Sequence, residues 1–487
     1  MIKLSFIKES LLYTIGNALP MAASVILLPF YTNYLSTTNY VALSFYIGIS
    51  LLYQILFSFS FEQYYGVFYT EVKHNANKVH RLNGSIFLYL LIQAGIIILI
   101  STLFGDALLK MIFDKTIPVY FFPYGLLSVF TGLFNALFKL SMSPFVYEQK
   151  PKLFFFSHLT NFLTTISLSL AGLFLFPDSL NGPIYGRFFS GFILLLFNYI
   201  LLKDKLVWKI EWTYIKEFIS KSWAIFAYTL ILWISGNIDR YLLKNYIPVN
   251  DLASYDLMMK CFIGIEFIQN GLSLAIVSKV FDLWKKENML RFHTEVNRYF
   301  NTFILATILA TLLFSALLPY FIKWIIRSSQ YYNGFQWITL IAVSFIIRAI
   351  SYPYYFALLY AKKTIYLFAI NSTLIVLQIL ASYLFIPQYG LIAALYIHII
   401  HKILLILTYH FSVRHYVNTQ KINVFKWFLL PLCISTASIC LYHLNPSLFV
   451  FNHFIILFIF LLTTLLIYKN ELKKLYTQLQ IYLPHLK

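Results

Sequence analysis

The chain alternates between long apolar stretches and short polar connections. A helix that crosses a bilayer needs about 20 mostly apolar residues, and about fourteen stretches of the sequence reach that length. They lie at about 10–34, 40–64, 83–104, 117–141, 153–176, 183–202, 222–246, 252–276, 299–320, 333–358, 364–386, 390–410, 427–444 and 450–468. With their connections they use up nearly all 487 residues. The pattern predicts an all-α integral membrane protein with no soluble domain.

The composition agrees with this pattern and excludes one class of partner. The chain is 60% hydrophobic and only 11% charged, whereas an average soluble chain is about half apolar and a quarter charged. Its formal net charge of +19 would suit nucleic acid if the basic residues formed a continuous patch. They are instead scattered through short connections, so we expect no nucleic-acid partner.

The lysines and arginines fall mainly in every second connection between the apolar stretches. Of the 37 basic residues, 26 lie in one set of alternate connections and six in the other set. Cytoplasmic loops of membrane proteins carry the excess of Lys and Arg. The asymmetry therefore predicts a multi-pass protein of the cytoplasmic membrane with both termini in the cytoplasm, and it favours an even number of spans.

Short matches recur between the two halves of the chain. They are 147–150 with 360–363, 39–42 with 250–253, and Pro177 with Pro387, at separations of 213, 211 and 210 positions. Near-equal separations predict two six-helix lobes that share one orientation and are related by an axis along the membrane normal. We expect an N-terminal lobe at 1–203, a C-terminal lobe at 204–415, and helices 13 and 14 with a cytoplasmic tail at 416–487.

Five basic residues lie within the predicted spans, and a sixth ends the seventh span. They are Lys139, Arg187, Lys260, Arg348 and Lys402, followed by Arg240. A cation in mid-span costs about 2.5–3.5 kcal/mol on insertion scales, so such residues usually face a bundle interior or a watery cavity. The alternative is that the side chain reaches the headgroups, which fits Lys139 and Arg187 best because they lie near span ends.

Four acidic residues accompany these cations. Glu62, Asp256 and Glu266 lie within spans, and Asp239 lies at the end of the seventh. Asp256 and Lys260 are four residues apart and can pair on one helix face, whereas Glu266 has no evident cation nearby in the sequence. Two roles stay open for the four acids: coupling to an ion, or internal pairing. For Glu62, contact with the cytoplasmic interface is a third.

The sequence contains no recognisable catalytic signature. Its eleven histidines show no metal-ligand spacing, and we find neither a phosphate-cradling glycine-rich loop nor a nucleophile elbow. We therefore expect a protein that is not an enzyme and has no cofactor or metal. Tyrosines within the spans either pack or line a cavity, where they could stack on sugars.

Two local passages resemble those of a known family. The passage Asp239-Arg-Tyr-Leu-Leu with Ala253-Ser-Tyr255 is similar to the segment that joins spans seven and eight in Wzx-type polysaccharide flippases. The passage 387–394 is similar to the one that opens their span twelve. Ala253 and Ala393 replace glycines that are usual there. The family belongs to the multidrug/oligosaccharidyl-lipid/polysaccharide exporter superfamily, and the resemblance covers essentially the whole chain.

This resemblance implies a function. Members of the family move undecaprenyl-pyrophosphate-linked oligosaccharides, the repeat units of O-antigen or capsule, across the bacterial inner membrane by alternating access around a central cavity. It implies roles in lipopolysaccharide biosynthesis and, as further partners, a polysaccharide polymerase and a chain-length regulator. Coupling to a proton or sodium ion is a further hypothesis that rests on the acidic residues alone. Under this resemblance, Arg348, Lys402 and Lys260 would contact the pyrophosphate, and Arg240 would act as a gate or as a contact between the lobes.

Two other functions stay open. A multidrug cation antiporter of the same superfamily would need a more acidic cavity than these residues provide. A membrane polysaccharide polymerase, which is an enzyme, typically has a large external loop. The longest connections here, near 203–221 and 277–298, are predicted to be cytoplasmic, which argues against a polymerase.

Overall fold

The computed structural model describes residues 4–113, 117–285 and 289–413, together with positions 458, 462 and 469. Within these ranges the chain is almost entirely helical, which confirms the predicted all-α class. The boundary between two compact units falls between Asn237 and Ile238. Each unit is described by itself.

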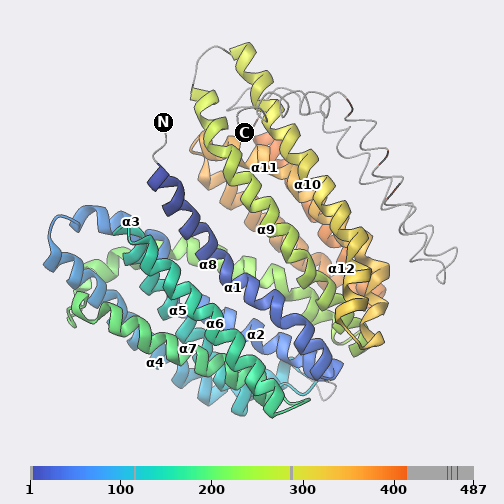
Figure 1. Cartoon of the computed structure of the whole chain (residues 1–487), viewed down its shortest axis with the longest axis horizontal. Helices are drawn as coiled ribbons and strands as arrows, with labels where there is room; N and C mark the ends of the chain where they lie inside the picture. The colour runs from blue at the N-terminus through green and yellow to red at the C-terminus, as the bar shows by residue number, and fades with distance from the viewer. Residues whose placement is uncertain are drawn as a thin grey trace. The chain divides into compact units, whose positions relative to one another are not determined.

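The first unit contains seven helices and most of an eighth. They are α1 (Leu4–Tyr34), α2 (Thr37–Ser58), α3 (Phe61–Val72), α4 (Ala76–Ile112), α5 (Leu126–Tyr147), α6 (Pro151–Leu175), α7 (Asn181–Leu202) and α8 (Trp212–Leu243), with short turns η1 (Phe121–Gly125) and η2 (Lys203–Lys205). Helix α1 packs on α6, α6 on α7, α7 on α5, and α5 on α2 (Figure 1). This series of contacts surrounds the polar residues considered below.

Helices α6 and α7 approach unusually closely. A Cβ atom on Gly182 would lie 2.3 Å from the carbonyl oxygen of Gly172, and one on Gly172 would lie 2.4 Å from that of Gly182. Neither position can hold a side chain without moving a backbone. Small residues at such a contact let two membrane helices pack backbone to backbone, where dispersion contributes most of the attraction.

The turn between α6 and α7 is tied to the turn between α1 and α2. The Oδ1 atom of Asp178 accepts a hydrogen bond from the backbone N–H of Ser36 at 2.6 Å, and another from Asn39 Nδ2 at 3.0 Å. Burial raises the pKa of Asp178, but the hydrogen bonds from these two donors outweigh it, so the pKa is lowered overall. Both helix pairs are thus held together at one end of the unit by an ionised carboxylate.

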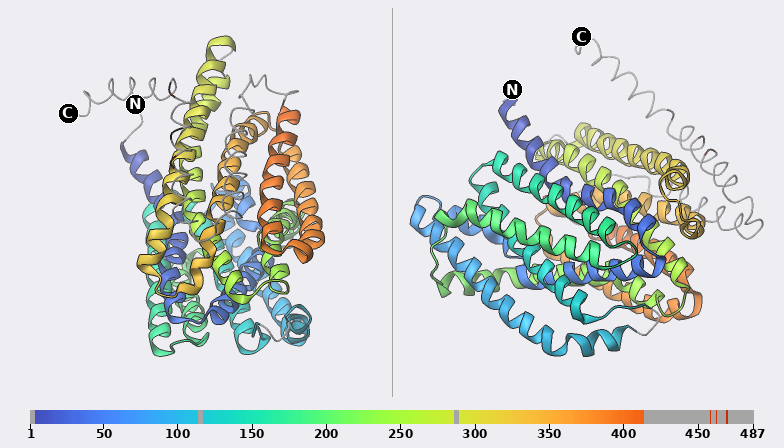
Figure 2. Two further views of the ribbon diagram at one scale, coloured as in Figure 1. Left: turned by 90° about the vertical axis from the view of Figure 1, so that its right-hand side faces the viewer. Right: turned by 60° about the horizontal axis from the view of Figure 1, so that its bottom comes forward.

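The second unit contains the remaining helices that the structure describes. They are α9 (Val249–Lys285), α10 (Met289–Ile325), the turn η3 (Ser329–Trp337), α11 (Ile338–Tyr360) and α12 (Thr364–Val413), joined by the end of α8. Helix α10 packs on α9 and α11, and α11 packs on α12. These helices run side by side in Figure 1, and Figure 2 shows the same arrangement from two further directions.

Helix α12 is broken at Gly390, where φ is 58° and ψ is −135°. A left-handed φ favours glycine because a side chain would clash with the backbone. Pro387 lies three residues earlier and cannot donate a helical hydrogen bond. The eleventh and twelfth predicted spans, 364–386 and 390–410, therefore lie on the two sides of this break.

The number of spans is consistent with the sequence prediction. Ten stretches in the described ranges are long and apolar enough to cross a membrane, and 365–413 is one of them although it contains two predicted spans. Helix α9, which contains the predicted eighth span with Asp256, Lys260 and Glu266, is not among the ten. The predicted spans 427–444 and 450–468 lie almost wholly outside the described residues.

The two units contain the same turn at corresponding positions. Helix α5 ends at Tyr147 and is followed by Gln149 with φ of 54°, and α11 ends at Tyr360 and is followed by Lys362 with φ of 56°. In both turns the next backbone N–H bonds back into the helix, from Lys150 to Phe145 at 2.8 Å and from Lys363 to Leu358 at 3.0 Å. This match supports the internal repeat. The lobe boundaries at 203 and 415 remain a prediction, because the unit boundary lies within α8.

Candidate functional site

A cavity of about 660 Å³ lies inside the first unit, between α1, α2, α3, α5, α6 and α7. Its volume is in the range typical of small-molecule sites. Five amide side chains line it: Asn17, Gln54, Gln63, Asn135 and Asn161. Among the described residues, the side chains of Asn17, Gln54 and Asn135 form no hydrogen bond. The cavity therefore offers several free amide donors and acceptors to a ligand.

One ion pair lies in this cavity. Lys139 Nζ on α5 is 2.6 Å from Glu62 Oε1 on α3, and the two side chains are 43% and 10% exposed. The second oxygen of Glu62, Oε2, is buried and has no hydrogen-bond partner within the ranges described. Two of the predicted site residues thus meet, although they come from different predicted spans.

Arg187 on α7 lines the same cavity and reaches into a small space between α2 and α5. Its Nε atom is buried without a hydrogen-bond partner in the described part of the chain, and no carboxylate there forms an ion pair with it. Burying a charge without a partner is costly. Arg187 therefore has no counter-ion among the described residues. This position favours a cavity role over contact with the headgroups.

Aromatic side chains line the part of the cavity near α6. His158 is 7% exposed, with the Phe138 ring centroid 5.0 Å away and that of Phe154 4.4 Å away. Next to it, Asn161 Oδ1 accepts a hydrogen bond from the Thr165 hydroxyl at 3.1 Å. The sequence did not predict a role for His158, Asn17 or Gln54. Nothing about their spacing marks them, because each comes from a different helix.

The second unit contains a cluster of three charged residues around one buried acid. Asp256 on α9 is 2% exposed, with Arg240 Nε 2.7 Å from its Oδ1 atom and Lys260 Nζ 2.6 Å from its Oδ2 atom, and both cations are 22% exposed. Lys260 lies one helical turn after Asp256, as the sequence suggested. The second cation, Arg240, comes from the end of α8. All three were candidate site residues, and the structure brings them together.

A separate pair joins α9 to α11. Arg348 Nη2 lies 2.8 Å from Glu266 Oε1, so the acid that lacked an evident cation in the sequence finds one on another helix. One turn further along each helix, the Tyr352 hydroxyl donates to Asn270 Oδ1 at 2.7 Å. Arg348 is thus anchored and partly neutralised.

Asp239 occupies a third buried position in the second unit. His398 Nε2 on α12 lies 2.7 Å from its Oδ2 atom, and the Tyr255 hydroxyl donates to the same oxygen at 2.9 Å. One turn after His398 on α12, Lys402 forms no hydrogen bond or ion pair with any described residue.

The candidate residues therefore separate into three groups. Lys139, Glu62 and Arg187 line the cavity of the first unit. In the second unit, Arg240, Lys260, Arg348, Asp239, Asp256 and Glu266 all lie in polar pairs or clusters. Lys402 is the remaining candidate. Arg187 and Lys402 are the two candidate cations that form no ion pair within the described ranges, which makes them the most available to an anionic ligand.

Comparison with known proteins identifies the fold. No family model matches the chain, and no curated protein matches it. Among solved structures, the lipid II flippase MurJ in an inward closed conformation matches 94% of this chain and 99% of its own, at a TM-score of 0.67 and 16% identity.

Two further structures match 84% of this chain, each at 12% identity. An inward-facing multidrug resistance MATE transporter of the MOP superfamily covers 96% of its own chain at a TM-score of 0.59. A MOP superfamily transporter from Pyrococcus furiosus covers 95% of its own chain at a TM-score of 0.55. The chain therefore has the multi-pass helical fold of these membrane transporters.

Proposed function

We propose that the protein is a flippase that moves an undecaprenyl-pyrophosphate-linked oligosaccharide, a repeat unit of O-antigen or capsule, across the bacterial inner membrane by alternating access. One observation carries the proposal: Arg187 lines an amide-lined cavity and forms no ion pair with any residue that the structure describes. A guanidinium group is well suited to phosphate because it donates two parallel hydrogen bonds to it.

The cavity has groups that suit each part of such a substrate. Arg187 provides a fixed positive charge for a phosphate, and the free amides of Asn17, Gln54 and Asn135 can bond to sugar hydroxyls. The lipid chain would remain in the bilayer. No bond is made or broken in this process, so binding and release are the only chemistry required of the protein.

Lys139 can add a second positive charge if Glu62 takes up a proton or another cation. The side chain of Lys139 is 43% exposed, but that of Glu62 is only 10% exposed, so the Glu62 carboxylate is costly to leave charged without a partner. Lys139 can therefore exchange Glu62 for a phosphate oxygen when the substrate enters and the carboxylate accepts a proton or binds a cation, which supplies a link between substrate and coupling ion.

The second unit contains two further cations that would contact phosphate at another step of the transport cycle. Lys402 has no counter-ion among the described residues, and Arg348 has one acidic partner. Both fit contact with phosphate in the alternate state. Coupling to a proton or sodium gradient through Asp239, Asp256 or Glu266, and cooperation with a polysaccharide polymerase and chain-length regulator, belong to the same proposal.

This role of the second unit is tested by changing Arg348 and Lys402 together to alanine. In a strain whose surface polysaccharide depends on this protein, we expect the glycan to fall about 10- to 100-fold, because each charge-assisted hydrogen bond contributes about 1.5–3 kcal/mol. The control changes two exposed lysines to alanine: Lys73, in the connection before α4, and Lys78, in the first turn of α4. Wild-type glycan in the first variant, at equal protein abundance, would contradict the assignment.

A second candidate function is a multidrug cation antiporter. The buried and unpartnered Oε2 atom of Glu62 favours it, because that oxygen could accept an organic cation. MATE transporters with this fold are among the structural matches. Gradient-driven export of a cationic dye by the purified protein, lost in Glu62→Gln, would favour the antiporter over the flippase.

A further inference from the structure

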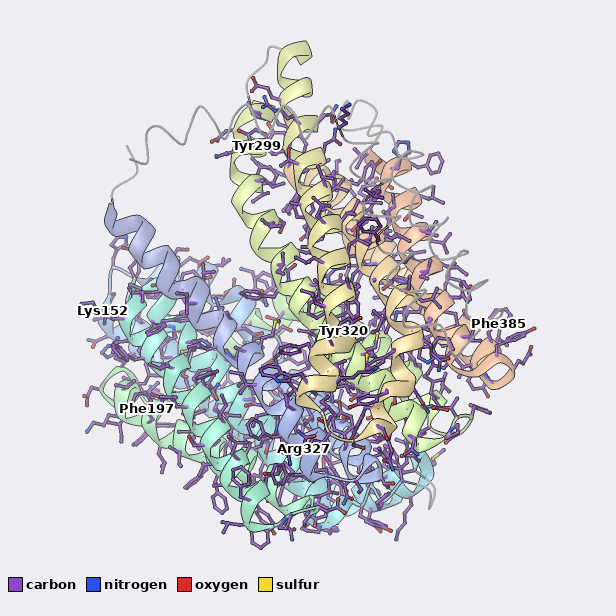
Figure 3. The ribbon with its side chains drawn as sticks, turned by 45° about the vertical axis from the view of Figure 1, so that its right-hand side comes forward. Lys152, Phe197, Tyr299, Tyr320, Arg327 and Phe385 are labelled. Carbon is purple, nitrogen blue, oxygen red and sulfur yellow. The ribbon has the colours of Figure 1, made fainter. Side chains whose placement is uncertain are left out.

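A second, separate cavity lies on the first unit, between α4, α5 and α7. It holds about 220 Å³ and is lined chiefly by apolar side chains, among them Phe87, Leu91, Leu137 and Leu196. Leu206 and Trp208, in the segment after α7, close one end. Figure 3 labels Phe197, which lies on α7 beside this groove's residues. We call it the α4–α5–α7 groove.

One polar side chain within the groove has no partner. Asn198 is only 4% exposed, and neither its Nδ2 nor its Oδ1 atom forms a hydrogen bond to any described residue. A buried amide normally has partners for both groups. Asn198 lines the groove, so the missing partner is expected to come from whatever occupies it.

Water is a poor occupant of this groove. A buried water needs two to four polar partners, and Ser141, the other short polar side chain in the lining, already donates its hydroxyl to Phe138 O at 2.7 Å. A molecule that is apolar over most of its length and carries one hydrogen-bond acceptor fits better. The ester carbonyl beside the acyl chain of a phospholipid has this chemistry.

The end of the groove has the features of a membrane interface. The rings of Tyr199 and Trp208 lie 6.4 Å apart and are about half exposed. Amphipathic aromatic residues are enriched at the headgroup level of membranes. Lys203 and Lys209 flank this end in the sequence and are exposed, whereas Lys205 already pairs with Glu148. Two lysines are thus available to an anionic headgroup.

The segment that closes the groove is held firmly against α4. Val207 N–H donates to His80 O at 3.1 Å, and Ser85 Oγ donates to Lys209 O at 2.9 Å. A Cβ atom on Gly84 would lie 1.8 Å from Val207 O, so glycine is required for this contact. The backbone that closes the groove is therefore preformed, which lowers the entropic cost of binding a ligand.

From these features we propose that the α4–α5–α7 groove binds one acyl chain of an anionic phospholipid, with the ester carbonyl at Asn198 and the phosphate at Lys203 and Lys209. A polyprenyl chain is a weaker fit, because it has no polar atom along its length to satisfy Asn198. The site is separate from the amide-lined cavity and does not depend on the proposed transport substrate.

The test measures quenching of Trp208 by brominated lipids. The full-length protein is placed in nanodiscs with brominated phosphatidylglycerol or brominated phosphatidylcholine, and the Trp208 signal is the difference between wild type and Trp208→Phe. We expect stronger quenching by the anionic lipid. We also expect Asn198→Leu to weaken that lipid's apparent affinity about two- to tenfold, which corresponds to the loss of one hydrogen bond.

Several variants keep the test decisive. Asn198→Asp keeps the shape of the side chain but repels phosphate, so it should also weaken binding. Replacing both Lys203 and Lys209 with glutamine should remove the preference for the anionic lipid. Trp324, which is 82% exposed on α10, provides a control signal that none of these changes should alter. Equal quenching by both lipids in wild type, unchanged quenching in both Asn198 variants, or displacement of the brominated lipid by polyprenyl phosphate would overturn the proposal.

Discussion

Arg187→Ala should lower surface polysaccharide about 10- to 100-fold while leaving the protein as stable as wild type. The expected loss of function follows from the loss of charge-assisted hydrogen bonds to phosphate, each of which contributes about 1.5–3 kcal/mol. The expected stability follows from the structure. Arg187 has no counter-ion in the described ranges and a buried, unpartnered Nε atom, so its removal leaves no protein charge unpaired.

Two further variants make this prediction specific. Arg187→Lys keeps the charge but loses the planar fork of the guanidinium, so it should retain part of the activity. Arg81→Ala removes an arginine that is 51% exposed and pairs with Glu211 at 3.2 Å, and it should leave polysaccharide unchanged. If Arg187→Ala lowered the melting temperature in proportion to the lost activity, Arg187 would have a structural role instead.

Asp256→Asn should destabilise the second unit strongly. Asp256 is 2% exposed and forms ion pairs with both Arg240 and Lys260. Breaking a buried ion pair by removing one partner costs about 3–5 kcal/mol, because a charge is left buried without compensation. That is a large share of the roughly 5–15 kcal/mol that holds most proteins folded. Thermal unfolding of the purified protein, at fixed detergent and lipid, measures the effect.

A matched control tests whether the loss of stability comes from the burial of the carboxylate and not from the loss of a charge alone. Asp106 pairs with Lys110 at 2.6 Å, but the side chains are 42% and 70% exposed, so Asp106→Asn should change stability by only about 0–1 kcal/mol. Equal melting temperatures for the two variants would contradict the structural role of Asp256. If folded Asp256→Asn protein transported substrate without an ion gradient, Asp256 would instead act in coupling.

Much of the fold follows from the hydrophobic pattern. Twelve of the predicted spans correspond to helices in the described ranges. A run of about 20 apolar residues in a membrane must satisfy its own backbone hydrogen bonds, and a helix does so. The details that the pattern missed have local backbone causes. The predicted span 40–64 is divided between α2 and α3 by left-handed residues at Phe59 and Ser60, neither of which is a glycine.

The site could be predicted only where its contacts are local. Asp256 and Lys260 are one helical turn apart, so their spacing indicated the pair. Lys139 with Glu62, and Arg348 with Glu266, come from different helices, and no single helix face contains either pair. The sequence also could not show that Arg187 lacks an ion-pair partner among the described residues. That follows only from the positions of the surrounding helices.

The most direct test of the flippase function uses proteoliposomes. The purified full-length protein is reconstituted with a fluorescent undecaprenyl-pyrophosphate-linked oligosaccharide, and a membrane-impermeant quencher reports how fast the labelled headgroup changes leaflet. We expect rapid exchange with wild-type protein and slow exchange with Arg187→Ala. Exchange at the rate of protein-free liposomes, or wild-type exchange in Arg187→Ala, would contradict the proposed function and its cationic site.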